Sequence, residues 1–286
     1  MAKKVILTSD STTDLSAELI ERYNVQILPL GISLGGTLYR DGIDINPDKI
    51  YDHYAKTGEL PKTSAVNLEE CADFFRPYVE EGYSIVHFSI SSEMSSTFNN
   101  CRLAAMEFED VYVVDTRNLS TGGGLLVISA GEMVNQGLEA KEIAEKCEEL
   151  ATRVDASFVI DSLEFLHKGG RCSSIEAFGA NLLKLKPCIA VRDGKMSAIK
   201  KYRGKYGAVL KEYITDMIGD ASDIELDKVF VTHAGCDEEI CKECVELVKS
   251  LAPFKEVFLT RAGSTVSSHC GKNTLGVLFI RKNKVQ

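Results

Sequence analysis

The sequence predicts an α/β protein of two domains, the first with a mostly parallel sheet and the second with a mixed sheet. Apolar runs alternate with segments of helical periodicity in the first half, which is typical of βαβ units. In the second half, Asp193-Gly194 lies between two apolar runs and favours a β-hairpin. A length of 286 residues also favours two domains. We place them at residues 1–154 and 155–286.

The first domain reads as strands separated by helices. Asp14 is the predicted N-cap of its first helix, Tyr39 to Gly42 form a turn, and Thr63-Ser64 lie in a loop of their own. The predicted strands cover residues 5–8, 25–30, 32–34, 84–88 and 111–114. The predicted helices cover residues 16–23, 68–80, 96–108, 122–135 and 140–153.

The second domain combines a hairpin with crossover helices, so its sheet is expected to be mixed. Gly169-Gly170 predicts a tight turn that holds Arg171 at a fixed point. The predicted strands cover residues 157–160, 188–191, 196–200, 229–233, 257–260 and 276–280, and the helices cover 175–183, 206–218 and 238–251. Because no long linker separates the domains, we expect tight packing with a cleft between them.

Charge and apolar content narrow the possible partners. The net charge is −9, which gives no general support for binding nucleic acid or an anionic membrane. No apolar stretch approaches the ~20 residues of a membrane span, and the N-terminal apolar run is too short for a signal peptide. The nine scattered cysteines fit reduced thiols better than a disulfide framework. These features predict a cytoplasmic protein.

Serine and threonine recur where the strands of the first domain should end. They follow the strands in the segments 9–14, 89–97 and 115–121, and Thr63-Ser64 adds a further pair. Ligands of open parallel sheets bind outside the carboxyl ends of the strands. Short hydroxyl donors with little charge suit a small anionic or polar head group, and by themselves they do not indicate bond-breaking chemistry.

The other motifs have weaker functional interpretations. No Gly-x-Ser-x-Gly or Walker-type loop is present, and His87 inside an apolar strand is best interpreted as a core histidine. The glycines 122–124 could cradle an anion or allow close helix–sheet packing, with equal weight for both. Cys241 and Cys244 should lie inside a helix, which disfavours a redox or zinc role.

Together these segments resemble the DegV family, the bacterial fatty-acid-binding proteins that serve as substrate carriers for fatty acid kinase. The resemblance runs in order from about residue 5 to residue 280. It rests on the segments Asp10 to Leu15, Tyr39 to Asp44, Thr63-Ser64, Ile90 to Phe98, Leu163 to Arg171, Leu182 to Pro187, and Ser268 to Gly271. The chain departs from the family pattern at Ser96, at Phe98 and from Cys270 to Asn273.

The resemblance implies a fatty acid held between the two domains, with its carboxylate bound by Thr63 and Ser95. Arg171 and His269 match residues near the head group and the surface that the kinase approaches. Ser64, Ser96 and Thr97 are further candidate contacts. The expected protein has no catalytic residue, metal or cofactor of its own. The alternative is a serine-dependent acyl hydrolase or transferase that uses an exposed serine such as Ser95.

Overall fold

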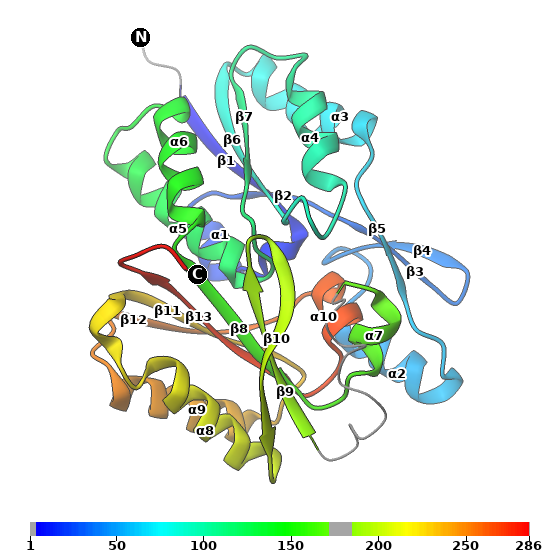
Figure 1. Ribbon diagram of the computed structural model, residues 1–286. Helices are drawn as coiled ribbons and strands as arrows, with labels where there is room; N and C mark the ends of the chain where they lie inside the picture. Colours follow the sequence, from blue (N-terminus) through cyan, green and yellow to red (C-terminus); the bar gives the residue numbers. More distant parts are fainter. Residues whose placement is uncertain (1–3, 172–184, 286) are drawn as a thin grey trace.

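A computed structural model describes residues 4–171 and 185–285, and Figure 1 shows two sheets with their helices stacked one above the other. The helix predicted at residues 175–183 lies outside the described residues, as do residues 182–184 of the segment that resembles the family. β8 (Val154–Ile160) begins the second sheet. The start of β8 agrees with a domain boundary near residue 154, and the boundary itself stays a prediction.

The N-terminal sheet is parallel throughout, in the order β2-β1-β6-β7. Helices cover both of its faces, as expected for βαβ units. Its strands are β1 (Lys4–Asp10), β2 (Gln26–Leu28), β6 (Tyr83–Ser89) and β7 (Val111–Asp115). The helices of this part are α1 (Ala17–Arg22), α3 (Leu68–Glu80), α4 (Thr97–Ala105), α5 (Thr121–Asn135) and α6 (Ala140–Ala151).

The C-terminal sheet is mixed, in the order β10-β9-β8-β13-β11-β12, and only β11 and β12 pair in parallel. The hairpin predicted at Asp193-Gly194 is confirmed as the connection of β9 and β10. The remaining strands are β9 (Leu185–Arg192), β10 (Lys195–Arg203), β11 (Ile224–Ala234), β12 (Glu256–Arg261) and β13 (Thr274–Arg281). The helices α8 (Tyr206–Ile218) and α9 (Glu238–Leu251) cover one face.

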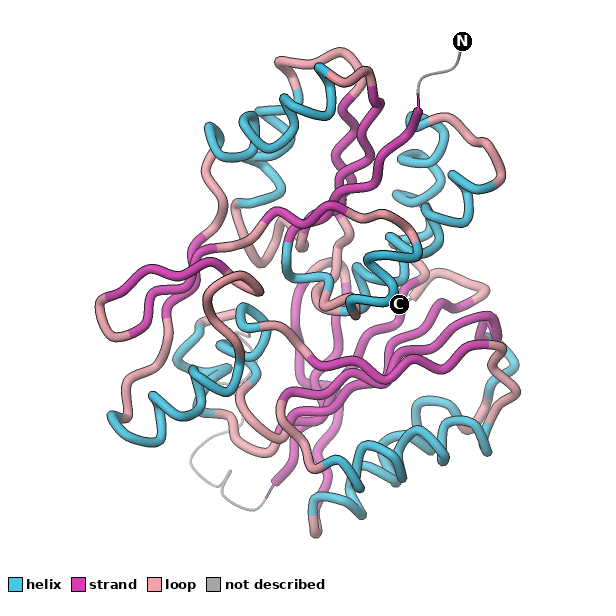
Figure 2. The backbone as a smooth tube through the Cα atoms, turned by 180° about the vertical axis from the view of Figure 1, so that it is seen from behind, coloured by secondary structure: helices cyan, strands magenta, loops and turns pink. Residues whose placement is uncertain are grey.

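A small antiparallel sheet between the two main sheets was not predicted. It has the order β4-β3-β5, and Figure 2 shows it at one side of the molecule. Its strands are β3 (Gly31–Leu34), β4 (Thr37–Arg40) and β5 (Lys62–Ser64). Thr63 pairs with Ile32, so Thr63-Ser64 form a strand and not a loop of their own. Ile32 and Thr63 are 31 positions apart, so no local sequence pattern indicates that their strands pair.

Three short helices lie beside this sheet: α2 (Pro47–Thr57), α7 (Glu164–Gly169) and α10 (Ser264–Cys270). The sequence prediction contained none of them as helices. Phe165 of α7 packs edge-on against Tyr54 of α2, with ring centroids 4.8 Å apart, so segments of both domains meet here. The predicted N-cap Asp14 is wrong, because the hydroxyl of Ser16 caps α1 while Asp14 adopts a left-handed conformation with φ of 49°.

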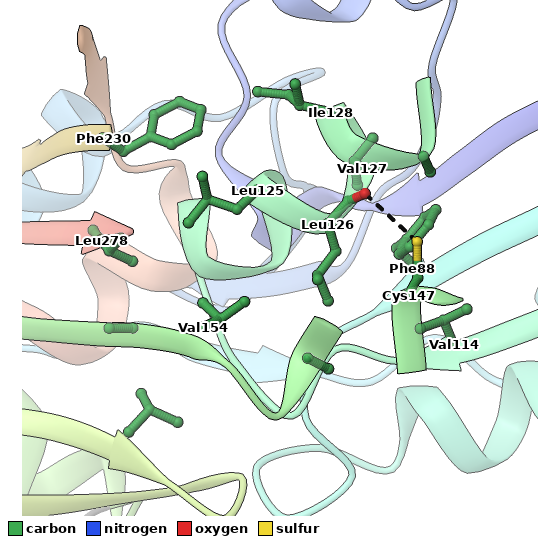
Figure 3. Close-up of a cluster of buried hydrophobic side chains, with 14 of the residues drawn as sticks. Phe88, Val114, Leu125, Leu126, Val127, Ile128, Cys147, Val154, Phe230 and Leu278 are labelled. Carbon is green, nitrogen blue, oxygen red and sulfur yellow. Dashed lines mark hydrogen bonds between the residues drawn. The ribbon is translucent and has the colours of Figure 1, made fainter. Parts of the chain in front are cut away.

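α5 joins the two domains into one hydrophobic core. Figure 3 shows Leu125 to Ile128 of α5 between side chains of the N-terminal part and side chains of the C-terminal sheet. These four residues have no exposed surface. The tight domain packing expected from the sequence is confirmed by this shared core. No helix in residues 4–171 and 185–285 has the length and apolarity to cross a membrane.

Candidate functional site

Most of the predicted site residues line a cavity between the domains. Its free space is about 750 Å³, including the part open to solvent. We call it the polar chamber. Its polar wall consists of Thr63, Ser64, Ser95, Ser96, Arg171, Thr265 and His269. Its apolar wall consists of Leu30, Ala65, Ile90, Met94, Leu119, Phe158, Leu166, Met196, Val266 and Cys270.

Thr63 and His269, from opposite domains, touch within this chamber. Oγ1 of Thr63 lies 2.8 Å from Nε2 of His269, which is hydrogen-bond distance. β5 positions Thr63 and α10 positions His269. If Nε2–H donates to Oγ1, the threonine hydroxyl keeps its proton for a ligand. The bond therefore connects a predicted ligand-binding hydroxyl to a predicted partner-facing histidine.

Ser95 lies in the turn that leads into α4. Its Oγ accepts a hydrogen bond from the backbone N of Thr97 at 3.2 Å and lies 2.9 Å from Oγ1 of Thr97. The first bond fixes the hydroxyl at the start of the helix, as a capping side chain does. Ser96 and Ser64 also line the chamber, whereas Thr97 is buried outside its wall. Thr97 therefore orients Ser95, and its own contact with a ligand stays a prediction.

His269 is uncharged at neutral pH in this environment. Burial, and to a smaller extent the neighbouring Arg171, lowers its pKa to about 4. A neutral imidazole can donate a hydrogen bond through one ring nitrogen and accept one through the other. α10 holds the ring in place.

Gly169 leaves the room that the His269 ring occupies. A Cβ built at position 169 would lie 2.5 Å from Nδ1 of His269. Gly170 follows with φ of 67° and ends α7, and Arg171 comes next. The predicted tight turn before Arg171 is confirmed at the end of a short helix. Arg171 is exposed, lines the polar chamber, and donates from Nη1 to the Gly169 carbonyl at 2.6 Å.

Gly169→Ala should destabilise the protein by about 1–3 kcal/mol, although alanine normally favours a helix over glycine. The added methyl group must displace the imidazole ring and strain its bond to Thr63. Urea unfolding measures the loss, and the NMR shifts of His269 should change. Gly207→Ala in α8 is the control, because a Cβ there meets nothing within 4 Å. Equal stability of the two variants would contradict the packing argument.

A second cavity lies beside the first, against the C-terminal sheet. It has about 400 Å³ of free space, including the part open to solvent, and nearly all of its wall is apolar. We call it the apolar chamber. Its wall consists of Leu119, Ser120, Ala156, Phe158, Val191, Thr232, His233, Ala234, Ala262, Val266, Cys270, Thr274, Gly276 and Leu278. Leu119, Phe158, Val266 and Cys270 line both chambers, so the two cavities adjoin.

Most of the hydroxyl-rich edge predicted from the sequence holds the protein together and does not face a ligand. Asp10, which is fully buried, accepts hydrogen bonds from the side chains of Thr12 and Ser89 at 2.6 and 2.9 Å. Thr116 donates to the Ser89 carbonyl at 2.8 Å. Of the hydroxyl side chains in the segments 9–14, 63–64, 89–97 and 115–121, those of Thr63, Ser64, Ser95 and Ser96 line the polar chamber and that of Ser120 lines the apolar chamber.

The other motifs have structural roles. The glycines 122–124 are buried, and a Cβ at Gly124 would lie 2.9 Å from both the Thr13 carbonyl oxygen and a Leu15 methyl group, which favours the packing interpretation. His87 is buried with Nδ1 2.9 Å from Thr8 Oγ1. Cys241 and Cys244 are buried in α9. In the part of the chain that the structure describes, no cluster of three His, Cys, Asp or Glu side chains suits a metal.

Two aspartates of the N-terminal domain hold the start of α10. Asp41 accepts from the backbone N of Ser264 at 2.9 Å and of Thr265 at 3.0 Å, and Asp14 accepts from Gly263 N at 2.8 Å. No side chain of α10 caps its own N-terminus. Burial raises the pKa of Asp14 to about 8. Sequence reasoning missed this anchor, because its partners lie more than 200 positions apart.

Comparisons with known proteins place this architecture in a family. The family model described as "Uncharacterised protein, DegV family" matches residues 4–282. The chain belongs to the DegV family. A DegV domain-containing protein of Clostridium perfringens is 31% identical over a 291-residue alignment that covers 99% of each chain. The family resemblance found in the sequence is thereby confirmed.

Solved DegV structures share the whole fold. A DegV family protein from Thermus thermophilus, described for its fatty acid binding, is 30% identical with a TM-score of 0.89, and the match covers 97% of this chain and 99% of that one. A stearic-acid-binding protein from Eubacterium ventriosum is 28% identical with a TM-score of 0.83 and 99% coverage of both chains. The predicted α/β class with one parallel and one mixed sheet agrees with these structures. Fatty acid binding is thus described for both of these DegV relatives.

Proposed function

We propose that this protein binds one long-chain fatty acid and presents its carboxylate to a fatty acid kinase. The observation that carries the proposal is that the polar chamber and the apolar chamber lie side by side and share four wall residues. An amphiphile with a small anionic head and a long apolar tail matches that pair of cavities. The fatty acids bound by the relatives from Thermus thermophilus and Eubacterium ventriosum support the same ligand class.

The tail supplies most of the affinity in this proposal. Each buried methylene contributes about 0.8 kcal/mol, so a chain of ~15 methylenes could contribute on the order of 12 kcal/mol before the costs of ordering and association. The small side chains Ala156, Ala234, Ala262 and Gly276 leave room for it in the apolar chamber. Hydroxyl donors then fix the position of the carboxylate, with about 1.5–3 kcal/mol for each bond to the charge.

Mass spectrometry of an organic extract tests the ligand directly. The purified protein should release a fatty acid acquired from its host, and the stripped protein should bind added palmitate or oleate. An extract without fatty acid, together with no binding of either acid, would rule out the proposal. Rapid turnover of acyl esters or acyl phosphates that Ser95→Ala abolishes would instead favour the alternative hydrolase or transferase.

Thr63→Ala and Ser95→Ala should each weaken fatty-acid binding by about 1.5–3 kcal/mol, the free energy of one hydrogen bond to a charged group. Calorimetric titration with palmitate measures the change. Ser92→Ala in the same loop as Ser95 is the control, because Ser92 does not line the polar chamber. Affinity unchanged in the Thr63/Ser95 double variant would show that the carboxylate lies elsewhere.

The kinase would supply ATP and metal, so the chain needs no cofactor of its own. Hydroxyl groups suit this task better than a lysine, because the carboxylate must stay free to accept the phosphoryl group. We place this exchange in the cytoplasm, without nucleic acid or stable membrane insertion. The alternative enzyme has less support: among the described residues, Ser95 Oγ hydrogen bonds to Thr97, while His269 bonds to Thr63.

A further inference from the structure

Thr265 differs from the other hydroxyl and thiol residues of α10. The side chains of Ser264, Ser267, Ser268 and Cys270 each donate to a backbone carbonyl, at 3.3, 3.3, 2.7 and 3.0 Å. Oγ1 of Thr265 is buried, yet it has no hydrogen-bond partner among the residues that the structure describes. Nearly all buried polar atoms in proteins are paired, so an unpaired hydroxyl needs an explanation.

The position of Thr265 indicates what its partner is. Thr265 lies in the wall of the polar chamber together with Thr63, Ser95 and His269. It precedes His269 by four residues, which places both on the same face of α10. Nδ1 of His269 is also buried without a partner among the described residues. Thr265 and His269, one helical turn apart, therefore belong to the wall of the same cavity, and each carries an unpaired buried polar atom.

Thr265 is also held rigidly. Its backbone N donates to Asp41 at 3.0 Å, and only 4% of the residue is exposed. The start of α10 cannot rotate to pair the hydroxyl elsewhere without breaking the contacts to Asp41 and Asp14. An unpaired hydroxyl held in this way makes the ligand-free protein less stable. When a ligand supplies an acceptor, the hydroxyl forms a hydrogen bond and that cost is removed.

We propose that Thr265 is a further head-group contact, whose hydroxyl donates to the fatty-acid carboxylate from the C-terminal side. This inference rests on the proposed function. Thr63 and Ser95 then bind from the N-terminal domain and Thr265 from α10, so the carboxylate connects the two domains. A carboxylate can accept about four hydrogen bonds, which leaves room for all of these donors.

Thr265→Val tests the inference, since it replaces the hydroxyl by a methyl group of similar size. We expect palmitate and laurate to bind roughly ten- to a hundredfold more weakly, with the same factor for both acids because the lost bond is at the head group. We also expect the lipid-stripped variant to melt a few degrees higher than the stripped wild type, because an unpaired buried hydroxyl is gone. Thr265→Ser keeps the hydroxyl and should bind within a few-fold of wild type.

Ser268→Ala is the matched control on the same helix. It removes a hydroxyl that already donates to the Ser264 carbonyl, so it should lower the melting temperature and leave affinity unchanged. Unchanged palmitate affinity in Thr265→Val, a loss confined to the longer acid, or an equal loss in Thr265→Ser would overturn the inference. Failure of wild type to bind any fatty acid would overturn the proposed function instead, so the two failures are distinguishable.

Discussion

Asp41→Ala should lower the free energy of unfolding by about 2–5 kcal/mol, because it removes the acceptor for two backbone N–H groups at the start of α10. Ser264 N and Thr265 N donate to its two carboxylate oxygens, at 2.9 and 3.0 Å. Asp41 is only 3% exposed, so water cannot readily replace the lost acceptor. Each buried donor left unpaired costs about 1–3 kcal/mol. Urea unfolding followed by circular dichroism measures the difference.

Asp44→Ala provides the control for this prediction. Asp44 belongs to the same turn and accepts a backbone bond from Arg40 at 2.6 Å, but it is exposed. Its replacement should cost less than about 1 kcal/mol, because water can solvate the freed amide. If the two variants unfold at the same urea concentration, Asp41 does not hold α10 in the way described.

The anchoring of α10 has a consequence for the binding site. α10 carries Thr265 and His269, yet its first turn is held by carboxylates of the N-terminal domain. Their oxygens accept from backbone N–H groups that have no partner within the helix itself. The geometry of the polar chamber therefore depends on how the domains are joined, and a fatty acid that touches both sides should stabilise that arrangement.

Elements with local signals were predicted well from the sequence. The predicted helices at residues 68–80, 206–218 and 238–251 coincide with α3, α8 and α9. In these segments the apolar residues recur at helical spacing, and α3 and α9 begin after the capping residues Asn67 and Asp237. The hairpin of β9 and β10 was equally clear, since Asp193 and Gly194 both adopt the positive φ that its turn requires.

Elements that depend on distant partners were not predictable in this way. α10 has seven residues and is capped by Asp14 and Asp41, which no pattern around residue 264 reveals. β5 is a three-residue strand whose signal lies in its pairing with β3. α2 did offer signals, an Asn46 cap followed by Pro47, but its weakly apolar composition hid them.

The predicted site residues gather in one cavity, but the contacts among them were not predictable from the sequence. The family resemblance named Thr63, Ser95, Arg171 and His269, and all four line the polar chamber. No sequence pattern indicates that Thr63 and His269 form a hydrogen bond, or that Thr97 is buried next to Ser95. Thr265 was missed because it stands out only by its buried hydroxyl, which has no hydrogen-bond partner among the described residues, and only the packed structure shows this.

The hydrogen bond between Thr63 and His269 gives His269 a different expected role from Arg171, although the resemblance had grouped these two residues together. The resemblance placed both Arg171 and His269 near the head group and the surface that the kinase approaches. Because His269 Nε2 lies 2.8 Å from Thr63 Oγ1, we now expect His269→Ala to weaken fatty-acid binding as well. Arg171 contacts the Gly169 carbonyl and is exposed at the chamber, so its effect on binding should be small.

Arg171→Ala should cut acyl-phosphate formation with the cognate kinase by roughly a hundredfold while changing palmitate affinity by less than about threefold. A fixed guanidinium can stabilise the charge that develops on a transferred phosphoryl group, and losing one such donor commonly costs 10²–10³ in turnover. Calorimetry with palmitate, beside coupled kinase turnover at saturating fatty acid, gives the two numbers. Arg171→Lys keeps the charge but not the planar fork, so it should recover only part of the rate.

Lys168→Ala is the matched control for the loss of one positive charge near the chamber. Lys168 is exposed on α7 and pairs with Glu164 at 2.8 Å, away from the wall of the polar chamber. It should leave both binding and turnover close to wild type, because an exposed pair of this kind contributes little. A parallel fall in affinity and turnover for Arg171→Ala would mean that Arg171 shapes the pocket. An equal loss of turnover in Lys168→Ala would mean that only the net charge of this surface guides the kinase.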